Sequence, residues 1–268
     1  MNKAEIVQLI RRKQSFLCVG LDSDPAKMPG HLPKTAEGVL AFNEAIIKST
    51  LPYAVAYKLN IAFYEALGED GWHALARTIE KIPKGEALII ADAKRGDIGN
   101  TAAQYAKAFF EQLDCDAITI SPYMGADSVT PFLAFDNKWS IVLGLTSNKG
   151  AEDVELQRLE NGRFVFQETM TRIAKLGNSE NIMFVIGATK AEYFSPIRSE
   201  FPDHFFLVPG VGAQGGTLEE LKMLMNGDIG LLVNSSRQII FASSGEDFAK
   251  ASAMKASELQ IQMSQMIG

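Results

Sequence analysis

The chain has 268 residues, 47% of them hydrophobic and 22% charged, so it can bury a sizeable core. Its formal net charge of -6 and isoelectric point near 5.2 offer no basic face to nucleic acid or to an anionic membrane surface. We therefore expect no nucleic acid and no membrane as partners, and an anionic ligand would need a local positive site.

The N-terminal residues 1–14, MNKAEIVQLIRRKQ, carry charges on both sides of a short apolar patch, which predicts a short amphipathic helix rather than a signal peptide. Cys18 and Cys115 lie in apolar surroundings without metal-ligand spacing, so we expect buried, reduced thiols in a cytoplasmic protein. No apolar run approaches the ~20 residues that span a membrane.

Eight short apolar runs, rich in β-forming residues, follow along the chain. They cover residues 15–22, 53–60, 87–94, 116–123, 140–147, 181–189, 205–212 and 229–237. Each begins as a near-continuous hydrophobic run, as parallel strands buried on both faces do. Helical spacing follows nearly every run, in residues 37–51, 70–82, 101–113, 128–135, 164–176, 217–225 and 246–266.

Eight β/α units predict an α/β fold, a (β/α)8 TIM barrel that forms a single domain over residues 1–268 with a short N-terminal helix. A doubly wound open sheet is the alternative. No linker or repeat divides the chain. The longest irregular stretch, residues 148–163, follows the fifth strand, where a mobile active-site loop is expected.

In such a barrel the chemistry lies at the C-terminal ends of the strands. The polar residues at those ends are Asp22, Lys58, Asn60, Asp92, Lys94, Asp97, Ser121, Tyr123, Thr146, Ser147, the segment 209–216, Ser235, Ser236 and Arg237. The two-residue period of a strand turns Asp92 and Lys94 to one face, and Lys58 ends the neighbouring strand. Two lysines and two aspartates gathered there suit proton transfer and electrostatic catalysis. A structural ion-pair network is the alternative.

The segment PGVGAQGG, residues 209–216, predicts a phosphate site together with Arg237 after the next strand. Glycines let the backbone approach an anion closely, and arginine can hold it with two parallel hydrogen bonds. A tight turn alone would also explain the glycines.

None of the three histidines, His31, His73 and His204, falls at the C-terminal end of a predicted strand. We therefore expect no catalytic metal, since metal-dependent epimerases built on this barrel use histidines at those ends. The glycines of residues 209–216 follow the seventh strand, not the first, so they are no dinucleotide fingerprint. We expect no cofactor.

The residues DAKRGDIGNTA, 92–102, fit the pattern D-x-K-x-x-D-I-x-x-T, in which the chain resembles the orotidine 5'-phosphate decarboxylase family, especially its longer bacterial members. The resemblance extends over nearly the whole chain through GLDSDP, KLNIAFYEALG, SPYMG, LTSNKG, PGVGAQGG and the arginine after the eighth strand. It implies cofactor-independent decarboxylation of orotidine 5'-phosphate to UMP, in pyrimidine biosynthesis.

The resemblance also implies residue roles. Lys58, Asp92, Lys94 and Asp97 would be catalytic, with Lys94 protonating C6 of the product. The substrate-binding residues would be Asp22 and Thr101 at the ribose, Ser147 at the pyrimidine edge, Pro209 and Val211 near the leaving carbon dioxide, and Gln214, Ser236 and Arg237 toward the phosphate. Family members are homodimers, in which Asp97 and Thr101 would reach into the partner's site.

Two positions depart from the pattern. Leu59 stands where proline is expected after the lysine, and Ser236 stands where short-form members carry glycine. Two other functions stay open. One is a metal-dependent sugar-phosphate enzyme, as in 3-keto-gulonate 6-phosphate decarboxylase or hexulose-phosphate synthase, and the other is a catalytically silent barrel that binds a nucleotide.

Overall fold

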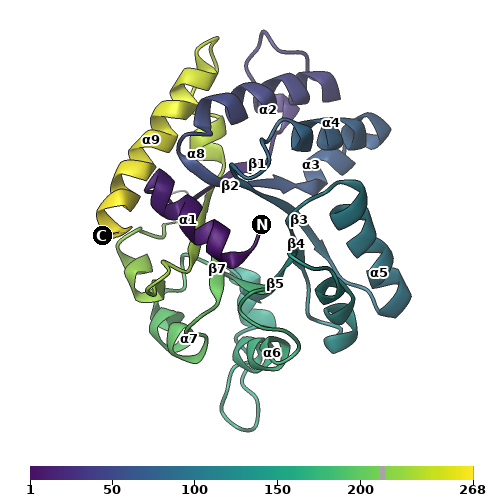
Figure 1. Cartoon of the computed structure of the whole chain (residues 1–268), viewed down its shortest axis with the longest axis vertical. Coiled ribbons are helices and arrows are strands. Elements are labelled where there is room, and N and C mark those ends of the chain that lie inside the picture. The colour runs from purple at the N-terminus through teal and green to yellow at the C-terminus, as the bar shows by residue number, and fades with distance from the viewer. Residues whose placement is uncertain (212–214, 268) are drawn as a thin grey trace. The chain divides into compact units, whose positions relative to one another are not determined.

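The computed structural model describes residues 1–211 and 215–267. The eight strands form a closed parallel barrel in chain order, so the predicted (β/α)8 TIM barrel is confirmed and the open sheet is wrong (Figure 1). The strands are β1 Leu17–Leu21, β2 Ala54–Asn60, β3 Leu88–Arg95, β4 Ala117–Ile120, β5 Trp139–Leu145, β6 Ile182–Ile186, β7 Phe205–Pro209 and β8 Leu231–Ser235. Each lies on a predicted apolar run, because the residues of these strands are almost all buried.

The α-helices are α1 Lys3–Lys13, α2 Ala36–Thr50, α3 Ile61–Glu65, α4 Gly68–Glu80, α5 Gly99–Lys107, α6 Val165–Ala174, α7 Phe194–Glu200, α8 Arg237–Ile240 and α9 Phe248–Ile267. The shorter segments are η1 Pro25–Lys27, η2 Ala108–Gln112, η3 Ala126–Ser128, η4 Thr130–Ala134, η5 Lys149–Asp153, η6 Ala191–Tyr193 and η7 Glu220–Leu224; η2 is π-helical and the others are 3₁₀. Within the described ranges no helix is both long and apolar enough to cross a membrane.

The helix predictions were wrong for two segments and missed three short helices. Residues 128–135 and 217–225 form only 3₁₀ turns, and the pattern missed α3, α7 and α8. Pro131 explains the first case, because proline lacks the N–H that an α-helix interior needs. Helix α7 has seven residues, of which only Phe194 and Ile197 are buried, too few to give a clear period.

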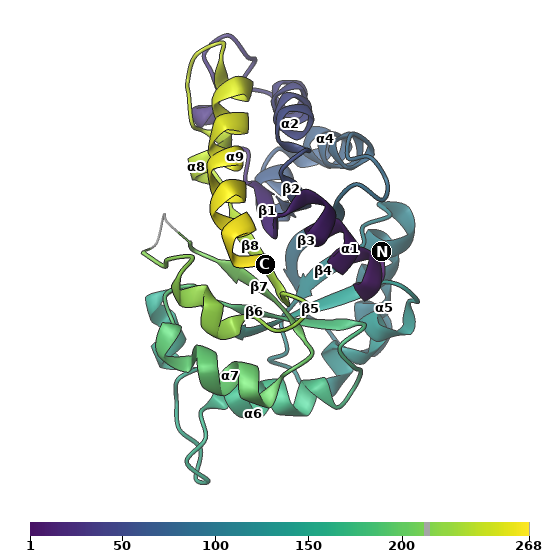
Figure 2. The same ribbon diagram turned by 60° about the vertical axis from the view of Figure 1, so that its left-hand side comes forward.

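Internal contacts group the chain into two compact units, one of residues 3–93 with the chain from residue 234 onward, the other of residues 94–233. The single-domain prediction therefore stays a prediction. In the first unit, α9 packs against α2 and α8, side by side in both views (Figures 1 and 2). Phe42 of α2 stacks on Phe241 and Phe248, with ring centroids 5.7 and 5.2 Å apart, which buries the apolar faces of these helices.

In the second unit, β4 pairs with β5, β5 with β6 and β6 with β7, all parallel. Arg198 of α7 joins this sheet to its helices, because its guanidinium donates to the carbonyls of Phe201, Leu224 and Gly230 and lies 4.3 Å from the Phe206 ring centroid. Burial lowers the pKa of Arg198 to about 10, against a raising effect of Asp203, so the group is still cationic at neutral pH.

Candidate active site

In the first unit, the strand register brings three of the predicted residues to one edge of the sheet. Leu21 pairs with Leu59, and Asn60 pairs with Asp92. Asp22 follows directly after β1, so its side chain and those of Lys58 and Asp92 lie at neighbouring strand ends. This follows from parallel pairing, which aligns the carboxyl ends of consecutive strands.

Lys58 is the centre of this group. Its Nζ donates to Asp92 Oδ2 at 2.6 Å and lies 3.7 Å from Asp22 Oδ1. The side chains of Lys58 and Asp92 are 6% and 9% exposed, and that of Asp22 is 22% exposed. One buried ammonium group between two carboxylates is a charge-assisted arrangement shielded from solvent.

Burial lowers the pKa of Lys58, but the charges of Asp92 and Asp22 raise it by more, so its net pKa lies above the ordinary lysine value. Lys58 therefore stays cationic throughout the neutral range. Cys18, on the strand that precedes Asp22, is buried, as predicted. Burial raises the pKa of its thiol to about 12, which rules out a thiolate nucleophile here.

Asp22 has a buried carboxylate oxygen, Oδ1, that receives no hydrogen bond from the described residues. Lys58 Nζ is an ion-pair partner for this oxygen, but at 3.7 Å it is beyond hydrogen-bond distance. A buried acceptor of this kind costs free energy unless a donor reaches it. Oδ1 therefore depends on the charge of Lys58, and the partly exposed remainder of the Asp22 side chain is what a ligand could reach.

At the end of β8, Ser236 lies against Gly20 of β1. A Cβ on Gly20 would come within 1.9 Å of Ser236 Oγ, so the serine requires glycine at residue 20. Asn234 Nδ2 donates to Ser236 Oγ at 3.2 Å, and Ser236 has a φ of -112°, which needs no glycine. Serine therefore fits at residue 236 without strain in φ. Arg237 begins α8 directly afterwards and is exposed.

Leu59, the other departure, continues β2 without interruption. It is fully buried and pairs with Leu21 and Ala91. Lys58 is therefore held inside a regular strand, and a proline is not required to orient it.

In the second unit, Lys94 has a strained backbone. Its φ is 48°, in the left-handed region that residues other than glycine seldom adopt, and its N–H donates to Thr119 Oγ1 on β4 at 2.9 Å. Its exposed side chain lines a cavity of about 430 Å³. Polar residues around the same cavity are Ser121, Tyr123, Thr146, Asn148 and Glu155. The positive φ departs from regular strand geometry, so the two-residue period does not by itself orient Lys94.

Three more predicted residues lie in loops and helix starts of this unit. Asp97 Oδ1 accepts a hydrogen bond from the Ile98 amide at 2.8 Å, and Thr101 lies in the first turn of α5. The Ser147 carbonyl accepts from Thr189 Oγ1 at 3.3 Å. A Cβ on Gly187 would come within 2.6 Å of the Ser147 amide nitrogen, so glycine is needed at residue 187 for this backbone to pass.

The remaining predicted residues follow β7. Pro209 ends the strand and its carbonyl accepts from the Ala188 amide at 2.9 Å, while Val211 is 7% exposed and bridges to Gly216. Gln214 lies outside the described residues.

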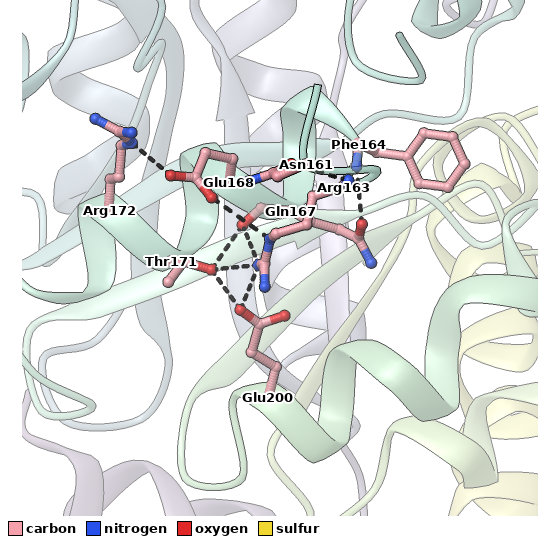
Figure 3. Close-up of polar contacts among 8 residues, drawn as sticks. All are labelled: Asn161, Arg163, Phe164, Gln167, Glu168, Thr171, Arg172 and Glu200. Carbon is pink, nitrogen blue, oxygen red and sulfur yellow. Dashed lines mark hydrogen bonds and ion pairs between the residues drawn. The ribbon is translucent and has the colours of Figure 1, made fainter. Parts of the chain in front are cut away.

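Residues 148–163 run from β5 to α6 and are held at both ends. Glu155 accepts hydrogen bonds from the Thr146 amide at 2.7 Å and from Thr146 Oγ1 at 2.8 Å. At the other end, Figure 3 shows the Arg163 guanidinium between α6 and α7, where it donates to Thr171 Oγ1 at 2.7 Å and to Glu200 Oε1 at 2.6 Å. The middle of this loop is thus tied to the end of β5 through Glu155, and its last residue is tied to α6 and α7.

Sequence patterns alone did not single out several residues that support this site. Thr119 and Asn234 belong to regular strands, and Glu155 lies in an irregular loop, so neither period nor motif distinguishes them. Asn60 was noted only as a strand-end residue; its Oδ1 accepts from the Ala62 amide and caps α3. Within the described part of the chain, no group of three or more His, Cys, Asp and Glu could hold a metal ion.

The barrel and its strand-end charges define this chain as a TIM-barrel protein with its polar site at the carboxyl ends of the strands. The family described as orotidine 5'-phosphate decarboxylase / HUMPS matches residues 15–252, and the chain belongs to this family.

Individual relatives agree with this assignment. The chain is 51% identical to the orotidine 5'-phosphate decarboxylase of Phocaeicola vulgatus, over 100% of this chain and 99% of that protein. It is 54% identical to the protein of that name from Christiangramia forsetii, over 98% and 97% of the two chains. The solved structure of Leishmania donovani OMP decarboxylase matches with a TM-score of 0.78 and 34% identity, over 97% of this chain and 99% of that one.

Proposed function

We propose that this protein is a carboxy-lyase that converts orotidine 5'-phosphate to UMP. The observation that carries the proposal is the buried ammonium group of Lys58 between Asp22 and Asp92, in a chain that belongs to this family. Relatives at about 50% identity bear the name of this enzyme over the full length of the chain.

The chemistry needs a fixed cation. When the bond between C6 and the carboxylate breaks, carbon dioxide leaves and the electron pair stays on C6 in an orbital that the ring π system cannot delocalise well. We propose that the Lys94 ammonium stabilises this carbanion and then transfers its proton to C6. The positive φ of Lys94 supports a functional role, because strained backbone persists where surrounding structure holds it in place.

Asp92 has a separate role in the proposal. Its carboxylate would repel the substrate carboxylate by roughly 4 kcal/mol at 4 Å and an effective dielectric constant near 20. This repulsion fades as carbon dioxide forms, which favours the transition state over the bound substrate. Lys58 and Asp97 would keep the set of four groups ionised.

The proposed substrate contacts divide between ribose, base and phosphate. Asp22, whose side chain is partly exposed, and Thr101 would bind the ribose hydroxyls. Ser147 would contact the pyrimidine edge, and Pro209 and Val211 would form an apolar wall near the departing carbon dioxide. Gln214, Ser236 and Arg237 would bind toward the phosphate, where the guanidinium can donate two parallel hydrogen bonds.

We also propose a homodimer with shared active sites. Ile98, Tyr123 and Met124 are 56%, 86% and 48% exposed, unusual for large apolar side chains, and Ile98 directly follows Asp97. A second copy covering these residues would bring Asp97 and Thr101 to the neighbouring site. Two buried thiols and an acidic surface support a cytoplasmic location.

The deciding experiment incubates the purified protein with EDTA and orotidine 5'-phosphate and follows the loss of near-ultraviolet absorbance of the orotate ring. We expect full turnover in the chelator. No turnover with or without added divalent metal would overturn the proposal. Turnover that EDTA abolishes would show that the decarboxylation needs a divalent metal and would contradict the cofactor-independent mechanism.

A further inference from the structure

A buried hydrogen-bond network lies directly behind Asp22 in the first unit. Ser23, Asn43, Tyr64 and Thr78 are each 0% exposed. Ser23 Oγ donates to Asn43 Oδ1 at 2.5 Å, and Asn43 Nδ2 donates to Tyr64 Oη at 3.0 Å and to Thr78 Oγ1 at 3.3 Å. Burying a polar group costs free energy unless the group is hydrogen-bonded, so apolar residues would pack here without that requirement.

Three buried hydroxyls hold the Asn43 amide in place. Tyr64 and Thr78 both take hydrogen bonds from Nδ2, which leaves Oδ1 directed at the Ser23 hydroxyl. Burial raises the pKa of Tyr64, so its hydroxyl stays neutral. The acceptor presented to Ser23 is therefore held in one position.

Ser23 is the residue next to Asp22, so its hydroxyl ties the backbone on the C-terminal side of Asp22 to helix α2. On the N-terminal side, Leu21 is held by its pairing with Leu59. Asp22 is thus fixed from both sides, while one of its carboxylate oxygens is buried with no hydrogen-bond donor among the described residues.

The same network reaches the strand that carries Lys58. Tyr64 lies on α3, which begins directly after Asn60 at the end of β2. Asn43 therefore connects the turn after β1, next to Asp22, to the helix that directly follows β2, the strand that carries Lys58. The network therefore adds to the β1–β2 pairing in holding these two segments together.

We infer that the Ser23–Asn43 hydrogen bond is a positioning device that holds the Asp22 carboxylate where it can accept from the ribose hydroxyls of the nucleotide. The inference rests on the proposed function, of which it specifies the sugar recognition. Ser23 and Asn43 act through Asp22 and do not themselves touch the substrate.

The test compares Ser23→Ala with Thr78→Val. Both variants delete one buried hydroxyl bonded to Asn43, but only Ser23 adjoins Asp22, so Thr78→Val controls for loss of stability. The readout is the ratio of affinities for UMP and its 2',3'-dideoxy analogue, measured by calorimetry together with the melting temperature of each variant. We expect Ser23→Ala to lower this ratio about five- to tenfold, the effect of one weakened hydrogen bond, and Thr78→Val to leave it within about twofold.

Coupling supplies the second readout. Ser23→Ala added to Asp22→Ala should change the ratio no further, whereas added to Arg237→Ala it should have its full effect. An unchanged ratio in Ser23→Ala, or an equal loss in Ser23→Ala and Thr78→Val, would overturn the inference. If the wild-type protein binds UMP with a hydroxyl preference that Ser23→Ala removes, yet never decarboxylates orotidine 5'-phosphate, the proposed function fails and the inference stands.

Discussion

Lys58 Nζ lies 2.6 Å from Asp92 Oδ2, and neither side chain is more than a tenth exposed. The net gain from a buried ion pair is small, because desolvation offsets the attraction, but an unpaired buried charge is costly. Replacing one residue of such a pair should therefore lower the free energy of unfolding by a measurable amount.

We predict that Lys58→Met lowers the free energy of unfolding by about 3–5 kcal/mol at pH 7, measured by urea denaturation, because it removes the buried ammonium group that pairs with both Asp92 and Asp22. Lys81→Met is the control. Lys81 lies 3.1 Å from Glu44 in an exposed pair, so its loss should cost at most about 1 kcal/mol.

The same variant has a defined pH dependence. The folded pKa of Lys58 is raised, so its stabilisation is fully present below the unfolded lysine pKa of about 10.4 and is lost as pH rises through the higher folded value. The difference between wild type and Lys58→Met should hold steady from pH 7 to about 10 and shrink above that. A decline that begins near pH 8 would contradict the raised pKa.

Lys94→Ala should lower kcat by about three orders of magnitude or more, since it removes both the cation and the proton donor. Its side chain is exposed, so the melting temperature should stay close to that of the wild type. The effect is measured as kcat at a saturating concentration of orotidine 5'-phosphate, from the loss of orotate absorbance. Near-normal turnover in a folded variant would refute the role of Lys94.

Arg237→Ala should mainly weaken binding of the phosphorylated substrate. The guanidinium would contact the phosphate alone, so KM for orotidine 5'-phosphate should rise by roughly 10- to 100-fold, the loss of a charge-assisted contact. The comparison substrate is orotidine, which lacks the phosphate and should be affected little. Equal losses for both substrates would mean that the phosphate lies elsewhere.

Mixing two inactive homodimers tests the shared site. After exchange, Asp97→Ala and Lys94→Ala subunits should form heterodimers in which one of the two sites is intact. Each heterodimer should then have about half the activity of a wild-type dimer. Exchange is followed independently by mass spectrometry of differently tagged subunits. No recovery despite proven exchange would show that each site uses the Asp97 of its own chain.

Arg163→Ala should destabilise the protein by about 1–3 kcal/mol, because its guanidinium donates to Thr171 and Glu200 and joins α6 to α7 (Figure 3). Arg172→Ala, in helix α6, is the matched control. Its side chain is 75% exposed and pairs with Glu168, so its loss should cost at most about 0.5 kcal/mol. Equal effects of the two variants would argue against the junction at Arg163.

The sequence alone determined the barrel, because eight apolar runs separated by helical periods leave few other ways to bury their surface. It also identified the strand ends that carry Asp22, Lys58 and Asp92, since parallel pairing puts consecutive carboxyl ends together. The family followed from the spacing of residues 92–101, which is dense enough in charged residues to be distinctive.

Only the tertiary structure decided the features that depend on distant partners. The left-handed backbone of Lys94 and its hydrogen bond to Thr119 cannot be predicted from the spacing of hydrophobic residues in the sequence. The Ser23–Asn43 hydrogen bond joins residues on separate elements. Ser236, after β8, packs against Gly20 of β1, which is more than 200 residues away in the sequence. Local pattern reports which residues are buried, whereas these contacts depend on which residues meet once the chain has folded.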